Sequence, residues 1–496
     1  MNESFLNEFK QDEQKILSEF FDNLLKNIDL SKKETKLLID DYEKAILYFY
    51  KNKSINEIIK ILAVENLGTI YKDKPHNWYP LDNSAKIYPL SMKKNWMSVY
   101  RISYYLNDNI IPEVLQMALL FTMKRFPIFR TSIRKGFFWH YIDEIKKYFK
   151  VVEDSKVPCS YINISKIGKP SFKVLYYKNR ISVEVFHILA DAYGGIVFLS
   201  TLVSEYLNLL GQKVNYNDLV FDVNEKVKVE ELKDDFIDKK IESKKGSLLD
   251  KKALMIDGKL SKIRPCQIIH FDLKTKELKS LAHKYNLTVN ELILSYLFLV
   301  ISYSTSKEGF IKIQVPVNMR KYYKSNTLRN FSLYNNISIK KSEVTSFEDV
   351  IKKVKYQSQE KLSRNKLNEV MRESNKLVRS LKLIPLFIKR PIANFIYGFI
   401  GDKSQTTVLS NLGVVKLPEN VLKHIKSADF ILGTTISNKM LFSLITINNI
   451  TTLTMSKYTT NTSIENNLYS IFKENNLIVK VHGSENYENR KWLSID

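Results

Sequence analysis

Alternating apolar and polar residues in the first half of the chain predict a β-hairpin. Two extended runs, at 172–177 and 181–187, are joined by a turn at 178–180. His187 ends the second run on the same face as the apolar residues of that run, because side chains alternate along a strand. We therefore expect its imidazole to point into an interior.

A helix is predicted directly after this strand. Gly194 and Gly195 break the strand, and residues 196–210 carry apolar side chains at helical spacing. A second amphipathic helix is predicted upstream, at about 111–124. The pattern thus puts a buried histidine at a strand-to-helix junction.

Outside this region, strands and helices alternate irregularly. The N-terminal part shows charged helical patterns, with Ser31 and Glu34 spaced as a capping box. The predicted helices there are 5–26, 31–51 and 55–64. In the second half, strands are predicted at 266–271, 310–317, 335–339, 406–411, 430–435, 441–447 and 451–456. A pair of helices is predicted over 274–302, and further helices are predicted at 347–381 and 463–475. This order favours an α/β class with mixed sheets covered by helices over a doubly wound fold.

The length predicts more than one domain. A chain of 496 residues exceeds the usual limit for a single hydrophobic core. We predict a helical extension over 1–75, a first lobe over 76–265 and a second lobe over 266–496. The charged segment 224–251 is expected to be an exposed connector near the lobe boundary.

His187 and Asp191 form an H-x-x-x-D pattern at the predicted junction. A neutral imidazole can take a proton from an alcohol or amine as that group attacks a thioester carbonyl, so the pair suits acyl transfer. Asp191 is expected to fix local geometry by pairing with an arginine rather than to touch substrate. On the pattern alone, the commoner explanation is a core histidine followed by a helix-capping aspartate.

Five stretches in order along the chain resemble the chloramphenicol acetyltransferase-like superfamily, which includes peptide-synthetase condensation domains and alcohol acetyltransferases. They are WYPLDNSAKIYP at 78–89, RFPIFRT at 125–131, the run from 187 to 195, LTVNELIL at 287–294 with VPVNMR at 315–320 and RNF at 329–331, and VLSNLG at 408–413. The resemblance implies a fold of two lobes around a central tunnel. Their order along the chain carries more weight than any one of them.

Roles for individual residues follow from the resemblance. It implies that His187 is the general base and that Asp191 is the orienting carboxylate, paired with Arg130 or, as a second candidate, with Arg320. For both arginines the alternative is a surface or loop position.

The resemblance also implies that Ser410 and Asn411 lie where a hydroxyl or amide donates to the tetrahedral oxyanion, although a strand-end cap is equally consistent with the sequence. Ala192 departs from the family, which normally has glycine after the aspartate. An alanine there is strained if the position needs a positive φ, unless Gly194 and Gly195 absorb the turn.

The resemblance further implies an acyltransferase that uses acyl-CoA as cosubstrate, with no bound cofactor and no metal. The acyl group, expected to be acetyl, passes to a small alcohol or amine. Two alternatives stay open: a carrier-protein-dependent condensation-type domain, and a non-catalytic binding relative, which Ala192 favours.

The formal charge of +24 adds little to this interpretation. Clustered lysines and arginines would indicate nucleic-acid binding, but here they are spread along the whole chain without a zinc finger, a glycine-rich phosphate loop or an RNA-recognition motif. Nucleic acid is therefore not expected as a partner. A positive surface would attract the phosphates of coenzyme A, an anionic membrane or a carrier protein.

Compartment is predicted from cysteine usage and from the N-terminus. Cys159 and Cys266 are far apart in sequence, so neither a disulfide framework nor a zinc site is expected. The N-terminus lacks the basic and apolar regions of a signal peptide, and a cytoplasmic location is expected. The most hydrophobic stretch, 381–400, is interrupted by basic residues and proline and does not fit a spanning helix. We expect it to pack against the second lobe, with a peripheral membrane contact as the alternative.

Overall fold

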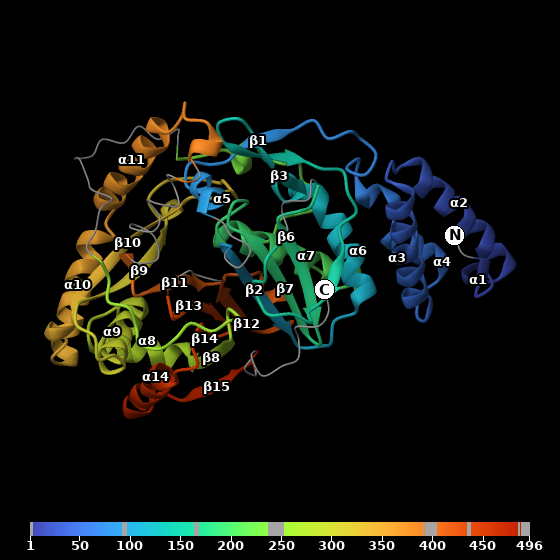
Figure 1. Cartoon of the computed structure of the whole chain (residues 1–496). Helices are drawn as coiled ribbons and strands as arrows, with labels where there is room; N and C mark the ends of the chain where they lie inside the picture. Colours follow the sequence, from blue (N-terminus) through green and yellow to red (C-terminus); the bar gives the residue numbers. More distant parts are fainter. Residues whose placement is uncertain are drawn as a thin grey trace.

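Strand pairing in this computed structural model forms three β-sheets, and helices pack against them (Figure 1). The structure describes residues 3–91, 97–162, 168–236, 252–389, 391, 404–433, 438–484 and 487. Both large sheets contain parallel and antiparallel pairs, so the predicted class of mixed sheets is confirmed.

The first lobe is built on a five-stranded sheet with the strand order β12-β2-β7-β6-β5. The predicted hairpin is present as β6 (Phe172–Tyr177) and β7 (Arg180–Phe186). The other strands are β2 (Val99–Leu106), β5 (Val151–Glu153) and β12 (Ile425–Leu432). The strand β7 therefore lies at the centre of the sheet and ends at the residue before His187.

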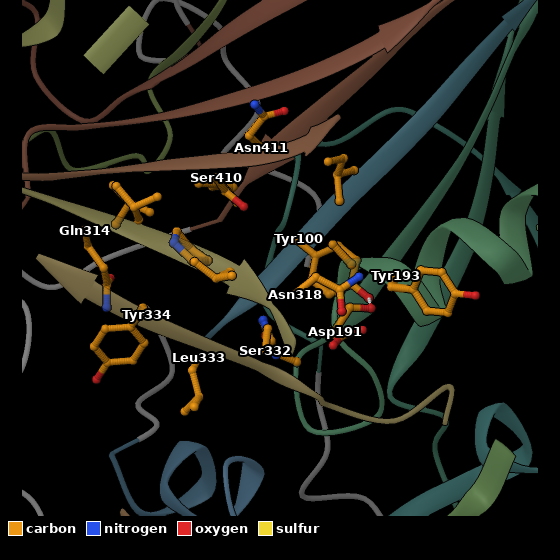
Figure 2. Close-up of a pocket in the computed structure, with 18 of the residues that line it drawn as sticks. Tyr100, Asp191, Tyr193, Gln314, Asn318, Ser332, Leu333, Tyr334, Ser410 and Asn411 are labelled. Atoms are coloured by element: carbon orange, nitrogen blue, oxygen red, sulfur yellow. Dashed lines mark hydrogen bonds between the residues drawn. The ribbon is translucent and has the colours of Figure 1, made fainter. Parts of the chain in front are cut away.

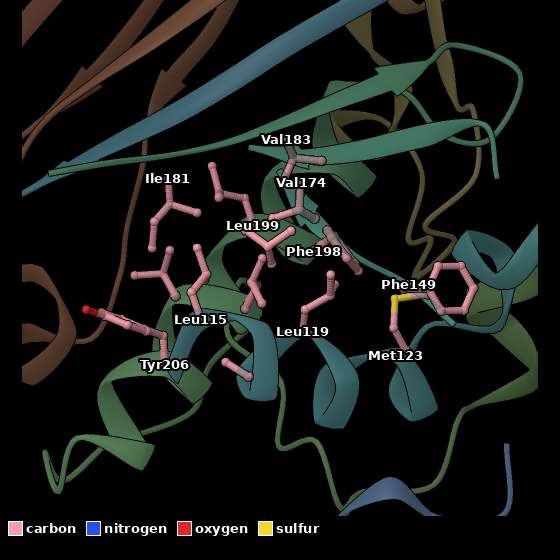
Figure 3. Close-up of a cluster of buried hydrophobic side chains, with 14 of the residues drawn as sticks. Leu115, Leu119, Met123, Phe149, Val174, Ile181, Val183, Phe198, Leu199 and Tyr206 are labelled. Atoms are coloured by element: carbon pink, nitrogen blue, oxygen red, sulfur yellow. The ribbon is translucent and has the colours of Figure 1, made fainter. Parts of the chain in front are cut away.

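Two helices, α6 (Pro112–Thr122) and α7 (Ala192–Leu209), cover one face of this sheet. Figure 3 shows Val174 of β6 and Val183 of β7 packed against Phe198 of α7. All three side chains are fully buried. The apolar face predicted from alternation on β7 therefore packs against these helices, and its burial fixes the register of the strand.

The opposite face of β7 is buried as well, which the alternation did not predict. Glu184 is 1% exposed and accepts hydrogen bonds from the Arg101 guanidinium at 3.0 and 2.7 Å. Burial raises the pKa of Glu184, but the charges of Arg101 and Lys173 and the hydrogen bonds to the carboxylate together hold the pKa below its ordinary value. A polar position on a central strand is thus satisfied by an ion pair inside the protein.

The second lobe contains a seven-stranded sheet with the order β10-β9-β11-β13-β14-β8-β15. The strands are β8 (Gln267–Lys274), β9 (Phe310–Asn318), β10 (Ser332–Lys340), β11 (Thr407–Val414), β13 (Met440–Ile447), β14 (Ile450–Lys457) and β15 (Val479–Gly483). The helices are α8 (Thr275–Lys284), α9 (Val289–Tyr303), α10 (Phe347–Lys361), α11 (Arg364–Ser380), α13 (Glu419–Leu422) and α14 (Ser463–Glu474). The predicted long helix over 347–381 is therefore two helices, which meet at the Ser363 cap of α11.

The strand β12 connects the two lobes. It follows β11 of the second lobe in sequence, yet it pairs antiparallel with β2 from Ile425↔Leu106 to Leu432↔Tyr100. The first lobe therefore includes a strand from outside the predicted segment 76–265. Backbone hydrogen bonds across the edge of the first sheet decide this placement, and local sequence does not encode them.

The N-terminal residues form a separate group of helices beside α6 (Figure 1). Ser31 caps α3 by accepting a hydrogen bond from the Glu34 amide, as the capping-box spacing predicts. Tyr148 of the first lobe donates a hydrogen bond to Asp41 of this group. The helices are α1 (Glu3–Leu6), α2 (Gln11–Lys26), α3 (Lys32–Tyr50) and α4 (Ile55–Ile61). The third sheet, β1-β4-β3, consists of β1 (Trp78–Pro80), β3 (Thr131–Lys135) and β4 (His140–Glu144), and α5 (Tyr88–Ser91) follows β1 in the chain.

The predicted exposed connector, 224–251, is mostly exposed over 224–230 and becomes buried from Glu231 onward. Glu231 is 3% exposed and accepts two hydrogen bonds from the Arg125 guanidinium, at 2.6 and 2.7 Å. Its carbonyl accepts the Leu328 amide at 2.9 Å. Residues 237–251 lie outside the described residues. The prediction of an exposed segment therefore holds for 224–230 and is wrong for 231–236, because an ion pair and a backbone bond hold Glu231 to the protein.

The hydrophobic stretch 381–400 is described up to residue 389 and at residue 391. Leu383 and Phe387 are 78% and 71% exposed, whereas Leu386 is buried and its amide donates to the Phe137 carbonyl at 2.9 Å. The described part therefore contacts the β3–β4 loop. Within the described ranges no single helix is long and apolar enough to cross a membrane, and α8 with α9 meets that test only as a pair bent by 79°.

We predict that Asp41→Asn stabilises the protein at about pH 7.5. Burial raises the pKa of Asp41 to about 6. The ionised carboxylate therefore destabilises the folded state. This cost is absent when Asp41 is protonated and grows as the pH rises past about 4. The melting temperature of the variant should exceed that of the wild type by a few degrees near neutral pH, and the difference should shrink toward pH 4. The exposed neighbour gives the control Asp40→Asn, and an equal gain in both variants would contradict the prediction.

Candidate active site

A cavity with a volume of about 950 Å³ lies between the two lobes and contains the predicted site. Figure 2 shows Tyr100 and Asp191 on its first-lobe side, and Gln314, Ser332 and Ser410 from β9, β10 and β11 on its second-lobe side. His187 also lines it. Both lobes therefore contribute to one site, as the resemblance implied.

His187 lies one residue beyond the end of β7. Its amide donates to the Ser98 carbonyl at 2.8 Å, which extends the pairing of β7 with the β2 side by one more bond. The imidazole is partly buried, with Tyr88 and Tyr100 at ring-centroid distances of 5.0 and 5.5 Å. Its Nδ1 lies 2.7 Å from Oδ1 of Asn330 in the second lobe. The ring thus has one nitrogen held by a side-chain amide and faces the cavity.

Asp191 is the N-cap of α7 and is also the centre of a contact between the lobes. One carboxylate oxygen accepts the Gly194 amide at 3.3 Å. The other accepts from the Arg320 guanidinium and from the Phe331 amide, each at 2.8 Å. The side chain is 5% exposed. The capping role and the orienting role, which the sequence presented as alternatives, are therefore carried by the same carboxylate.

Arg320, and not Arg130, is the partner of Asp191. Arg130 pairs with Glu144 at 2.8 Å, in the first lobe. Arg320 follows β9 in the 3₁₀ turn Met319–Lys321 and donates to the carbonyls of Thr327 and Arg329 as well as to Asp191. Its guanidinium stacks 4.5 Å from the ring of Tyr193. One arginine therefore fixes the loop that carries Asn330 against the start of α7.

Gly194 and Gly195 lie inside α7, so they do not form the predicted turn. A Cβ on Gly194 would lie 2.0 Å from the backbone oxygen of Leu328, and one on Gly195 would lie 2.5 Å from the hydroxyl of Tyr100. Both glycines are needed for close packing rather than for a positive φ. Ala192 is the first residue of α7 and is absent from the positive-φ residues, so the expected strain does not arise.

Ser410 and Asn411 both line the cavity on β11, but they point in opposite directions. In Figure 2 the Ser410 hydroxyl points toward the side of Tyr100 and Ser332, whereas the Asn411 carboxamide points away. The Asn411 amide donates to Asn290 at 3.3 Å, and its carbonyl accepts the Gly413 amide at 2.7 Å. Alternation along the strand therefore leaves Ser410 as the better-placed donor of the two.

The ionisable groups around the ring are limited in number. His187 is the one imidazole among the described residues that line the cavity. Burial raises the pKa of Tyr88 and of Tyr100, so both phenols stay protonated at neutral pH. Tyr100 donates to the Asp191 carbonyl at 2.7 Å. No group of three or more histidine, cysteine or acidic side chains that could hold a metal occurs in the part of the chain described here.

Two residues of the site were not assigned a role from the sequence. Asn330 and Asp82 lie in stretches quoted for the resemblance, RNF and WYPLD, but nothing in either stretch indicates that they meet. They are 248 positions apart, and Asn330 donates to Asp82 at 3.1 Å. Only the contact between the lobes brings them together.

Comparison with known proteins supports the fold alone. No family model and no curated protein matches the sequence. Trichothecene 15-O-acetyltransferase from Fusarium sporotrichioides is similar in structure, with a TM-score of 0.55 and 11% identity over 80% of this chain and 94% of that one. TRI101 from the same fungus, solved with coenzyme A and T-2, has a TM-score of 0.54 and 11% identity, over 82% of this chain and 100% of the other.

A peptide-synthetase domain is nearly as similar. The epimerization domain of tyrocidine synthetase B has a TM-score of 0.53 and 12% identity, with coverage of 80% and 95%. Acetyltransferases and peptide-synthetase domains therefore share the architecture of this chain. The predicted α/β fold of two lobes is confirmed.

We predict that Asp191→Ala destabilises the protein by about 3–5 kcal/mol, because it leaves the buried charge of Arg320 without a partner. It should also free the loop of residues 327–331, so the Phe331 amide should exchange with solvent faster. Urea unfolding and hydrogen exchange measure the two effects. The matched control is Glu144→Ala, which breaks the Arg130 pair and should leave exchange at Phe331 unchanged. Unchanged exchange in Asp191→Ala would show that the carboxylate does not hold the loop.

Alanine should be less well tolerated at position 194 than at position 195. Gly194→Ala should cost about 3 kcal/mol or more, since a backbone carbonyl blocks the new methyl group, whereas Gly195→Ala should cost less because the Tyr100 side chain can shift. Urea unfolding of the two variants measures the difference. The reverse order would refute the packing explanation.

Proposed function

We propose that this chain is an acyltransferase that moves an acyl group, expected to be acetyl, from a coenzyme A thioester to an alcohol or amine. His187 is the general base. The observation that carries the proposal is the position of His187, the one imidazole among the described residues that line the cavity between the lobes, with its Nδ1 lying 2.7 Å from Oδ1 of Asn330. A base held in this way needs little reorganisation when a substrate binds.

The chemical step needs one proton to move twice. The acceptor O–H or N–H gives its proton to Nε2 of His187 as the acceptor atom bonds to the thioester carbonyl carbon. The tetrahedral intermediate then collapses, the carbon–sulfur bond breaks, and the imidazolium returns the proton to the departing thiolate. No side chain is acylated, and the atoms balance as thioester plus alcohol giving ester plus thiol.

Ser410 is the proposed donor to the oxyanion of that intermediate. Its hydroxyl points into the cavity from β11, across from Tyr100. A hydroxyl donor placed where negative charge develops lowers the barrier more than it favours substrate binding. Asn411 is assigned a structural role, because its amide is bonded to Asn290 and Gly413.

The acyl donor is proposed to be a coenzyme A thioester rather than an acylated carrier protein. The positive charge of the chain favours a ligand with several phosphates. TRI101, which has a similar fold, was solved with coenzyme A. A condensation-type activity would use the same histidine with a pantetheinyl carrier, so donor choice is decided by assay. The sequence feature that favoured a non-catalytic relative was the strain expected at Ala192. That strain does not arise, because Ala192 occupies an ordinary helical position.

We predict that His187→Ala lowers the turnover number by about 10²–10⁴-fold and leaves the melting temperature nearly unchanged. Thiol release from acetyl-CoA against a panel of alcohols and amines measures turnover. His424→Ala is the matched control, because His424 lies outside the cavity and should keep full activity. If His187→Ala retained turnover, the base role would be refuted.

The same assay distinguishes acetyl-CoA from an acyl-carrier protein as the acyl donor. Acetyl-CoA and an acyl-carrier protein are offered in parallel to the wild-type chain, with free coenzyme A as competitor. Turnover with acetyl-CoA supports the proposal. Turnover with the carrier alone overturns it in favour of a condensation-type activity, and turnover with neither donor overturns acyl transfer from either class.

A further inference from the structure

We infer that Asp82 and Asn330 set the tautomer of His187, so that Nδ1 carries the proton and Nε2 is the free base. The inference rests on the proposed function and names two positioning residues for it. Neither residue needs to touch substrate. Their effect on turnover passes through the imidazole.

A chain of two hydrogen bonds links the three side chains. Nδ2 of Asn330 donates to Oδ2 of Asp82 at 3.1 Å, and Oδ1 of Asn330 lies 2.7 Å from Nδ1 of His187. Asp82 is 0% exposed and Asn330 is 1% exposed. Both bonds are therefore shielded from water, and an incorrectly oriented amide would leave buried groups unpaired.

The orientation of the Asn330 amide follows from the nature of its first partner. A carboxylate only accepts hydrogen bonds, so the NH₂ group of Asn330 must face Asp82. The amide oxygen then faces His187. An amide oxygen also only accepts, so Nδ1 must carry a hydrogen, and in the neutral ring Nε2 holds the lone pair.

Asp82 is positioned by contacts at both of its carboxyl oxygens. Its Oδ1 accepts from the Ala85 amide at 2.8 Å and from the Ser84 hydroxyl at 2.9 Å. The guanidinium of Arg329 lies 3.7 Å from Oδ2. These contacts leave Oδ2 directed at the Asn330 amide.

A second acid, Asp234, lies beside Asp82. Burial and the charge of Asp82 raise the pKa of Asp234 to about 6. Asp234 accepts the amides of Asn83 and Phe236, each at 3.1 Å, and so lies outside the chain of bonds to His187. Asp234 therefore offers a matched carboxyl for a control substitution.

The two lobes meet at this chain of bonds. Asp82 lies in the first lobe near β1, whereas Asn330 lies in the loop that Arg320 fixes against Asp191. The Asp191–Arg320 pair therefore helps to hold the loop from which Asn330 reaches His187. The geometry couples correct contact between the lobes to a correctly protonated base.

Asp82→Asn is the first test. The new amide can donate to Oδ1 of Asn330, which lets Asn330 turn its NH₂ group toward His187 and stabilises the tautomer with hydrogen on Nε2. Turnover should fall by about 10²–10⁴-fold, while KM for acetyl-CoA stays within a few-fold. Asp234→Asn is the matched control, since it removes a neighbouring carboxyl without changing the chain of bonds, and it should keep turnover within a few-fold.

A double variant provides a rescue that loss of structure cannot mimic. In Asp82→Asn/Asn330→Asp the order is reversed: the amide introduced at position 82 donates to the carboxylate introduced at position 330, which accepts from Nδ1–H of His187. Turnover should recover by about tenfold or more relative to Asp82→Asn alone, because the two positions are coupled. No recovery, with melting temperatures near that of the wild type, would overturn the inference.

The tautomer can also be observed without substrate. In protein labelled with ¹⁵N-histidine, the chain gives seven imidazoles, and His187→Ala identifies the resonances of interest. At a pH where the rings are neutral, wild type should have hydrogen on Nδ1, and Asp82→Asn should shift it to Nε2. Hydrogen on Nε2 in wild type overturns the inference but leaves the proposed function intact. Hydrogen on Nδ1 without thioester turnover overturns the proposed function alone.

Discussion

The ion pair between Asp191 and Arg320 is the contact on which the site depends. Two lobes with separate sheets must be held in one relative position if groups from both are to act on one substrate. Asp191 does this from the first turn of α7, where it caps the helix and accepts from Arg320 and Phe331 of the second lobe. Arg320 in turn holds the carbonyls of Thr327 and Arg329. Because both side chains are buried, the loss of either leaves an unpaired charge inside the protein.

Close packing at the same junction makes this arrangement specific and holds the base in place. The backbone of Leu328 approaches α7 so closely that only glycine fits at position 194, and the Tyr100 hydroxyl packs closely against position 195. His187 extends from this packed unit into the cavity, with its ring held by Asn330 and flanked by Tyr88 and Tyr100. A weak base can therefore be effective in the proposed reaction, because the gain comes from orientation and from the exclusion of water rather than from unusual basicity.

Much of the local structure could be predicted from the sequence. Periodicity located β6, β7, α6 and α7 to within a few residues, and the order of the family-like stretches predicted the fold. The sequence alone also singled out His187, Asp191 and Ser410, which all line the cavity. These features are local, because a strand alternation, a helix cap and a short motif are encoded by residues close together in the chain.

The tertiary structure decided what those residues meet. Asp191 pairs with Arg320 and not with Arg130, and β12 belongs to the first sheet. Asp82 accepts a hydrogen bond from Asn330, which is 248 positions away in the sequence. The tertiary structure also separated Ser410 from Asn411 by strand alternation and required glycine at 194 for space rather than for a turn. The physical reason is that partners for buried charges and amides are selected by the packing of the two lobes. Sequence spacing gives no information about that packing.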